Sequence, residues 1–175
     1  MRTIAIFSFV VSLVFQSCSN KTDSPFSGEV MGYKPIYITY DRLKEVSRQP
    51  SKELRQSGKI YVRGAYLFIS EPNQGIHIIN NIDNKNPKPI AFIKIPGSQD
   101  VELKGDILYS DNGLDLVAID ISNPESVKVV KRVADVFPYP MFPPFENVKF
   151  ECPDPKKGYV IDWELVQLND PRCSR

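Results

Sequence analysis

From residue 59 onward, short runs of β-branched and aromatic residues alternate with clusters of Gly, Asn, Asp and Pro. Each run is about five to seven residues long, the usual length of a strand, and the residues between the runs favour turns. The expected fold is therefore all-β, with mainly antiparallel pairing. The pattern predicts strands at residues 59–63, 66–70, 75–80, 89–95, 100–104, 107–110, 114–120 and 127–133.

These predicted strands form two groups of four, and the second group repeats the first. Residues 63–65, Arg-Gly-Ala, correspond to residues 104–106, Lys-Gly-Asp, and a glycine at the first central position suits a two-residue type II′ hairpin. The segment GIHIINNIDNKNP at 75–87 corresponds to GLDLVAIDISNP at 113–124. The offset is about 40 residues throughout, and four strands in such a period are the signature of propeller blades.

The second repeat also resembles a known family. Its strand and turn, LVAIDISNP, are similar to the LVIVD repeat of exported proteins that resemble β-propellers. The first repeat departs from this pattern at Asn80 and Asn81, where an aspartate and an aliphatic residue are usual. The resemblance implies a propeller-type architecture and export, in the manner of bacterial surface lipoproteins, in particular those of Bacteroidetes, and it implies no activity. The residues that carry the motif are Gly113, Leu116, Ile119, Asp120, Asn123 and Pro124.

Two four-stranded blades, at residues 58–97 and 98–136, are fewer than the four that a closed propeller needs. The expected architecture is therefore an incomplete propeller. Three explanations stay open. The chain is a shortened member of the family whose other blades are absent from this reading frame, or a self-contained stack of two sheets, or one part of a homo-oligomer that completes the ring.

The segments on either side of the repeats have different compositions. Residues 36–57 form a lead-in with one short helix, capped by Thr39 or Asp41 and ended by Pro50. Residues 137–175 are rich in Pro, which argues against a central strand at their start, although 159–165 predicts one more strand.

Aromatic residues gather in this C-terminal segment, and two interpretations are open. We expect the segment to cap the open face of the last sheet, because a repeat array needs such a cap at its ends. Alternatively, it is an aromatic platform for a glycan or for the extended strand of a protein partner. The aromatic residues are Tyr139, Phe142, Phe145, Phe150 and Trp163.

The chain begins with MRTIAIFSFVVSLVFQSC, which has the form of a secretory signal. Arg2 precedes an apolar core at 4–15 that is too short to remain as a comfortable membrane-spanning helix. The ending LVFQSC resembles the lipobox of bacterial lipoproteins, in which the cysteine is joined to diacylglycerol and the signal is cut just before it. The resemblance implies a signal peptide at 1–17 and a lipid on Cys18, and several acyl chains there would give stable anchoring.

Residues 18–35 are polar with scattered Gly and Pro, the composition of a flexible tether. The expected location is the cell envelope, with the membrane as a partner through the lipid. By analogy with lipoprotein sorting, Ser19 in place of an aspartate favours the outer membrane. Simple secretion is the alternative.

Charge and cysteine content narrow the picture further. The chain has 22 Lys and Arg against 21 Asp and Glu, without a basic cluster, and this balance argues against a nucleic-acid partner. With Cys18 lipidated, Cys152 and Cys173 remain as an even pair in an exported chain. They are expected to form a disulfide, and two free thiols are the alternative.

The sequence predicts no catalytic site, metal site or cofactor. His77, the single histidine, lies in a strand where packing is its usual role, and the chain lacks HxxxH, HExxH and CxxC spacings. Residues 111–115, DNGLD, superficially resemble part of a calcium loop but fit a turn better. Asp120 and Asn123 are expected to cap the turn that follows their strand.

The expected function is therefore a non-catalytic binding or interaction module of the cell envelope, with an unknown protein or glycan partner. One rival is an envelope hydrolase acting on glycans, which would need a pair of carboxylates. Another is a truncated propeller fragment without an independent function. The candidates for such a pair, whose spacing gives no positive support, are Glu71, Asp100, Asp111 and Asp115.

Overall fold

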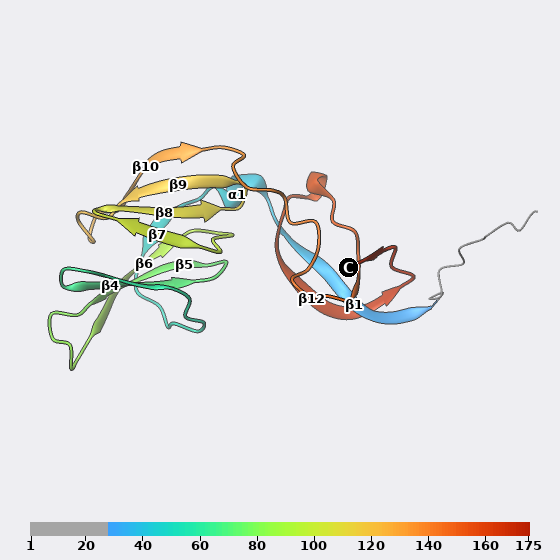
Figure 1. The fold of residues 1–175 in the computed structure, drawn as a ribbon, viewed down its shortest axis with the longest axis horizontal. Helices are drawn as coiled ribbons and strands as arrows, with labels where there is room; N and C mark the ends of the chain where they lie inside the picture. Colours follow the sequence, from blue (N-terminus) through green and yellow to red (C-terminus); the bar gives the residue numbers. More distant parts are fainter. Residues whose placement is uncertain (1–27) are drawn as a thin grey trace, which may run out of the picture.

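The computed structural model of the protein describes residues 28–175. The predicted signal peptide at 1–17, the lipid-attachment residue Cys18 and the first part of the predicted tether lie outside the described residues. Strands in three sheets make up most of the fold, and their pairing is mainly antiparallel (Figure 1). The all-β prediction is therefore confirmed.

The two repeats form two sheets that we call blade 1 and blade 2. Blade 1 has the order β2-β6-β5-β4-β3, with β2 at Ser47–Gln49, β3 at Ile60–Arg63, β4 at Tyr66–Glu71, β5 at Gly75–Asn80 and β6 at Lys88–Lys94. Blade 2 has the order β10-β9-β8-β7, with β7 at Val101–Lys104, β8 at Ile107–Asn112, β9 at Asp115–Asp120 and β10 at Lys128–Val133. Strands β3 to β10 lie where the hydrophobic pattern predicts them.

Blade 1 differs from the prediction because it has five strands instead of four. The additional strand β2 comes from the lead-in and pairs antiparallel with β6 at the edge of the sheet. Its sequence, Ser-Arg-Gln, has no strand pattern. Arg48 is held from blade 2, where its guanidinium donates to the backbone oxygen of Pro124 at 3.1 Å and to Glu125 at 2.6 Å.

The hairpin turns at Gly64 and Gly105 have the predicted type II′ geometry, and the turn at Gly113 adopts the same type. Gly64, Gly105 and Gly113 have φ angles of +55°, +60° and +66°, whereas the residue after each of them has no positive φ. A positive φ at the first central position alone defines the type II′ turn, which a glycine adopts without strain.

Blade 1 and blade 2 pack face to face around one core. Each fully buried aliphatic or aromatic side chain there contributes about 1.5–3 kcal/mol, so the core is the main source of stability for both sheets. Because the core draws on both sheets, neither buries its apolar face without the other. Blade 1 supplies Phe68, Ile76, Ile78, Ala91, Ile93 and Ile95, and blade 2 supplies Val101, Leu108, Val117, Ile119 and Ile121.

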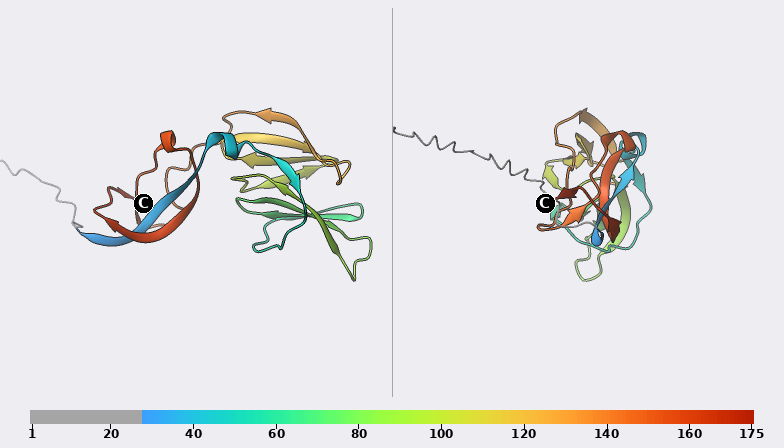
Figure 2. Two further views of the ribbon diagram at one scale, coloured as in Figure 1. Left: turned by 180° about the vertical axis from the view of Figure 1, so that it is seen from behind. Right: turned by 90° about the vertical axis from the view of Figure 1, so that its right-hand side faces the viewer.

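A third sheet joins the two ends of the described chain and lies to one side of the blades (Figure 2). Its order is β12-β1-β11-β13, and β1 is parallel to β11 and antiparallel to β12. Cys152 and Cys173 form a disulfide with a Cα–Cα distance of 5.3 Å at the edge formed by β11 and β13. The strands are β1 at Glu29–Ile38, β11 at Lys149–Phe150, β12 at Tyr159–Asn169 and β13 at Cys173–Ser174, and a 3-10 helix covers Pro155–Lys157.

The third sheet overturns two predictions. Residues 29–35 are not part of a flexible tether, because they belong to β1 and pair with β12 along its length. The C-terminal segment does not cap the open face of blade 2, because its strands β11, β12 and β13 form the third sheet together with β1. Both errors have the same cause: the pairing joins opposite ends of the chain, and a local pattern does not reveal such a partner.

The lead-in passes from the third sheet to the blades through helix α1, Tyr40–Leu43. Thr39 is its N-cap, which confirms one of the two predicted alternatives. The helix ends well before Pro50, because β2 follows it. Leu43 is 2% exposed and packs against the blade turns: a Cβ added to Gly113 would lie 2.6 Å from its Cδ2 atom. Asn112 Nδ2 also donates to the backbone oxygen of Leu43 at 2.7 Å.

We expect Leu43→Ala to lower the free energy of unfolding by about 2–5 kcal/mol, because it leaves a cavity where α1 meets the blades. Urea denaturation followed by circular dichroism measures this change. The control is Val62→Ala, which removes methyl groups from a 69% exposed side chain and should change the free energy by less than about 0.5 kcal/mol. Equal losses in the two variants would contradict the buried position of Leu43.

Candidate binding groove

The carboxylate of Glu71 and the imidazole of His77 form a buried pair on blade 1. His77 Nε2 lies 2.8 Å from Glu71 Oε2, and the ring of His77 packs 4.8 Å from that of Phe92. His77 is only 2% exposed, so it does not face a substrate. The structure therefore gives it the packing role that its strand position predicts.

Glu71 is also held by the segment that precedes β3. Lys52 Nζ lies 2.9 Å from its Oε2 atom and 4.2 Å from the ring centroid of Phe92, and the Arg55 amide donates to Oε1 at 3.3 Å. Burial alone would raise the pKa of Glu71, but its bonds to Lys52 and His77 outweigh burial and lower the pKa to about 2. Glu71 therefore carries a charge that the surrounding contacts neutralise.

The other candidate carboxylates are also engaged in structural contacts. Asp100 pairs with Lys59 at 2.7 Å, and Asp111 accepts from the backbone amides of residues 99 and 100 at 2.9 Å. Asp115 pairs with Arg132 at 2.8 Å. The DNGLD segment thus forms a turn in which the carboxylate oxygens of Asp111 and Asp115 already have partners.

The motif residues of the repeat also have structural roles. Asp120 Oδ1 accepts from the amide of Ser122 at 2.8 Å, and Asn123 Oδ1 accepts from the amide of Glu125 at 2.9 Å, which is the predicted capping of the turn. In the first repeat, Asn80 makes the same bond at 3.0 Å to residue 82. The departure from aspartate at this position therefore keeps the turn intact.

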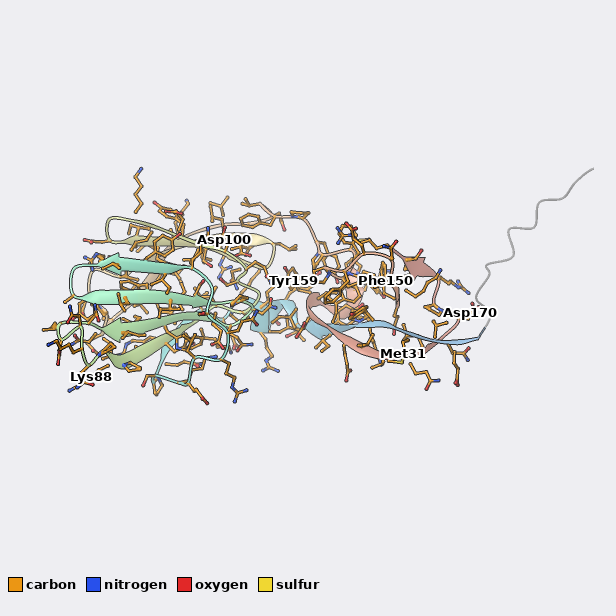
Figure 3. All side chains as sticks on the ribbon, turned by 60° about the horizontal axis from the view of Figure 1, so that its bottom comes forward. Met31, Lys88, Asp100, Phe150, Tyr159 and Asp170 are labelled. Atoms are coloured by element: carbon orange, nitrogen blue, oxygen red, sulfur yellow. A yellow bond between two sulfur atoms is a disulfide. The ribbon has the colours of Figure 1, made fainter. Side chains whose placement is uncertain are left out.

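Between the blade turns and the third sheet lie two adjoining hollows, which we call the polar half and the aromatic half of the junction groove. Their volumes are about 700 and 600 Å³. They adjoin because Asn73, Gln99 and Asp162 line both. Figure 3 labels Tyr159, which lines the aromatic half, where the blades and the third sheet meet. The polar half is also lined by Lys52, Glu53, Arg55, Gln56, Glu71, Pro72 and Gln74.

Tight turns at the ends of the blade strands place the amide side chains. Asn73 occupies the turn between β4 and β5 with a φ of +64°, and its amide donates to the backbone oxygen of Ser98 at 2.6 Å. The side-chain amide of Gln99 donates to Asn73 Oδ1. Asp111, whose pKa is raised by burial, fixes the backbone of Gln99 from below. These hydrogen bonds hold Asn73 and Gln99 in fixed positions on the blade turns.

Contacts on one side of each aromatic ring hold the aromatic half in place. Phe145 stacks on Tyr33 at a centroid distance of 4.7 Å, and the guanidinium of Arg175 lies 4.2 Å above the ring of Phe142. Phe142 and Phe145 remain 50% and 45% exposed. Trp163 meets Phe150 edge to face at 5.6 Å. The disulfide between β11 and β13 lies beside Arg175 and so helps to fix this wall.

Two tyrosines close the inner end of the aromatic half. Tyr139 donates its hydroxyl to the backbone oxygen of Gly158 at 2.9 Å, and its ring meets that of Tyr159 at 5.9 Å. Burial raises the pKa of each hydroxyl to about 12, and the charge of Asp111 adds to the effect at Tyr159. Both hydroxyls therefore stay protonated and neutral at physiological pH.

The sequence identified part of this groove. Tyr139, Phe142, Phe145 and Trp163 come together as an aromatic wall, whereas Phe150 is buried behind it. Sequence reasoning missed the amides and the residues at the far end of the chain, because they share no motif. Within residues 28–175 there is no cluster of three or more metal-ligating side chains, and no helix in that range is long and apolar enough to span a membrane.

Comparison with known proteins identifies the second repeat. Residues 97–135 match the family model of the LVIVD repeat, and this match confirms the resemblance seen in the sequence. No curated protein and no solved structure matches the chain significantly.

We expect Glu71→Gln to weaken the dependence of stability on pH. Since the pKa of Glu71 is lower in the folded protein than its ordinary value of 4.5, its ionised form stabilises the fold at neutral pH, and this contribution is lost as the pH falls toward about 2. The variant should lose about 1–3 kcal/mol at pH 7 and show a shallower decline in acid. Urea denaturation across this pH range measures both effects.

The matched control is Glu164→Gln, which changes an exposed carboxylate on β12 and should leave the acid decline as in the parent protein. If the Glu71→Gln variant lost stability with falling pH as steeply as the parent protein, the buried ion pair would not contribute to the pH dependence of stability.

Proposed function

We propose that this chain, which carries an LVIVD repeat at residues 97–135, is a lipid-anchored, non-catalytic binding module of the cell envelope. The observation that carries the proposal is the junction groove, which is built from blade turns and from the third sheet together. Both halves have volumes in the range of ligand sites. The repeats act as a rigid scaffold, and the groove is the surface that recognises a ligand.

The chemistry of the groove suits binding better than catalysis. Glu71, its most deeply buried acid, is neutralised by Lys52 and His77, and the tyrosine hydroxyls keep their protons. Besides the charged side chains of Glu53, Arg55 and Asp162, the groove offers a ligand a set of amides and exposed ring faces. These groups recognise shape and hydrogen-bonding pattern without transferring protons.

The position of β1 supports an anchor on the side away from the groove. The lipid on Cys18 would be followed by residues 19–28 before β1 begins at Glu29, and this linker can span about 35 Å when extended. Glu29 is paired with Asn169 at one end of the third sheet, while the groove is at the opposite end of that sheet, beside the blades (Figure 1). An outer-membrane anchor would thus present the blades and the groove away from the bilayer.

The anchor predicts a defined modification at Cys18. Mass spectrometry of the protein purified from membranes of the producing cells should find an N-terminal peptide that begins at Cys18 and carries acyl chains. Cys18→Ser should abolish this peptide. An unmodified Cys18 in the soluble fraction would contradict the anchor without bearing on the groove.

The groove predicts saturable binding to isolated cell envelopes. A labelled chain that begins at Ser19 retains every residue that the structure describes, and it should bind envelopes of the producing cells with a measurable Kd. The double variant Phe142→Ala/Phe145→Ala removes two exposed rings from the groove and should weaken this binding about tenfold, because aromatic contacts contribute about 0.5–1.5 kcal/mol each.

The matched control for this experiment is Ile60→Ala/Val62→Ala. Both side chains are also exposed and apolar, but they lie on β3 and do not line the groove. The control should bind as the parent does. Equal loss in both double variants, or no saturable binding by the parent, would overturn the proposed function.

A further inference from the structure

The polar half of the junction groove is rich in side-chain amides and carries charges of both signs. Four of its side chains are amides, namely Gln56, Asn73, Gln74 and Gln99. An amide both donates and accepts hydrogen bonds, as a hydroxyl group does. Asn73 and Gln99 already bond to each other, and Gln74 Oε1 accepts from Lys52 at 3.5 Å, so these amides keep only part of their hydrogen-bonding capacity for a ligand. The remaining donors and acceptors match a ligand that carries many hydroxyl groups better than they match an ion.

The charges along the whole groove balance. The three cationic side chains, Lys52, Arg55 and Arg175, face three acids, Glu53, Glu71 and Asp162. Lys52 and Glu71 already neutralise each other, and Arg175 lies over the ring of Phe142. A phosphate or an acidic polymer would need an excess of cations, and a basic peptide would need an excess of acids. The groove has neither, and this balance favours a neutral ligand.

The aromatic half offers flat ring faces to such a ligand. One face of the Phe145 ring is occupied by Tyr33 and one side of Phe142 by Arg175, yet each side chain stays about half exposed. Flat aromatic faces pack well against the C–H faces of sugar rings, whose hydroxyls point outward from the ring edge. Because the aromatic rings are already held in place, binding costs little conformational entropy.

The backbone of the aromatic wall argues against the extended strand of a protein partner. Residues 138–145 form no strand, and Pro138, Pro140, Pro143 and Pro144 have no backbone N–H to donate. Strand addition needs a row of free backbone donors and acceptors at a sheet edge. Residues 138–145 therefore have few donors and do not extend a sheet. The edge strand β12 also lines the aromatic half, and the protease digestion described below tests a protein partner there.

From these features we infer that the junction groove binds a neutral oligosaccharide, with sugar hydroxyls on the amides of the polar half and sugar faces on Phe142 and Phe145. The inference rests on the proposed function and names its ligand class. The two adjoining halves, about 700 and 600 Å³, accommodate a chain of several sugar rings better than one compact molecule.

Trp163 provides a direct test, because it is the only tryptophan of the chain and lines the aromatic half. The chain from Ser19 is titrated with neutral oligosaccharides of glucose, xylose, mannose and N-acetylglucosamine, and with an acidic oligogalacturonate. At least one neutral oligosaccharide should change the fluorescence of Trp163 saturably. Phe142→Ala/Phe145→Ala should raise its Kd about tenfold, whereas Ile60→Ala/Val62→Ala should leave the Kd unchanged.

Envelope binding separates a failure of the ligand class from a failure of the binding role. Binding of the labelled chain should survive digestion of the envelopes with protease and should be displaced by the neutral oligosaccharide that Trp163 detects. Two results would overturn the inference of a neutral glycan ligand and leave the proposed binding function standing. In the first, protease digestion abolishes envelope binding. In the second, oligogalacturonate displaces the bound chain and no neutral oligosaccharide does. Absence of both envelope binding and a Trp163 response overturns both.

Discussion

Face-to-face burial between blade 1 and blade 2 is the interaction on which the rest of the structure depends. The same face of the repeat is used unequally in its two copies. Val101 and Leu108 of the second repeat are buried against the first, whereas their counterparts Ile60 and Leu67 stay exposed or half-exposed on the outside of blade 1. A sheet with an apolar face needs a partner or a cover there. The other parts of the chain supply such cover.

The two outer faces are treated in different ways. On blade 1, residues 51–58 cover part of the face: Lys52 lies over Phe92, and the Arg55 amide donates to Glu71 Oε1 at 3.3 Å. On blade 2 the residues themselves change, because the positions of Phe68 and Ala91 are taken by Tyr109 and Lys131, which are exposed. A segment covers the outer face of blade 1, whereas Lys131 makes that of blade 2 more polar although Tyr109 and Val133 remain exposed there.

How much of the fold the sequence could predict depends on how far apart along the chain the interacting residues lie. Strands β3 to β10, the type II′ turns at Gly64 and Gly105 and the Thr39 cap, as one of two alternatives, depend on neighbouring residues and were identifiable. Strand β2 of blade 1 was not, because its pairing with β6 is not visible in its own sequence. Strand β1 was not, because its Gly32 and Pro35 read as a linker and its partner β12 lies at the other end of the chain. Similarly, the aromatic residues of the groove stood out by composition, but Asn73 and Gln99 meet them only once the third sheet is in place. Local patterns therefore predict the scaffold, whereas the junction groove becomes visible only in the tertiary structure.

The junction groove also explains why a repeat scaffold would carry a third sheet. The blade turns provide amides but no exposed aromatic wall, and the third sheet provides the rings but no row of amides. The two contributions meet at Tyr159, whose ring lies so near the turn at Gly97 that an added Cβ would be 3.2 Å from its Cε1 atom. Since repeat folds serve many functions, a ligand site is defined by what is attached to the repeats. In this chain the attachment is the disulfide-closed sheet, and the shape of the groove depends on the contacts by which Leu43 and Tyr159 hold this sheet against the blades.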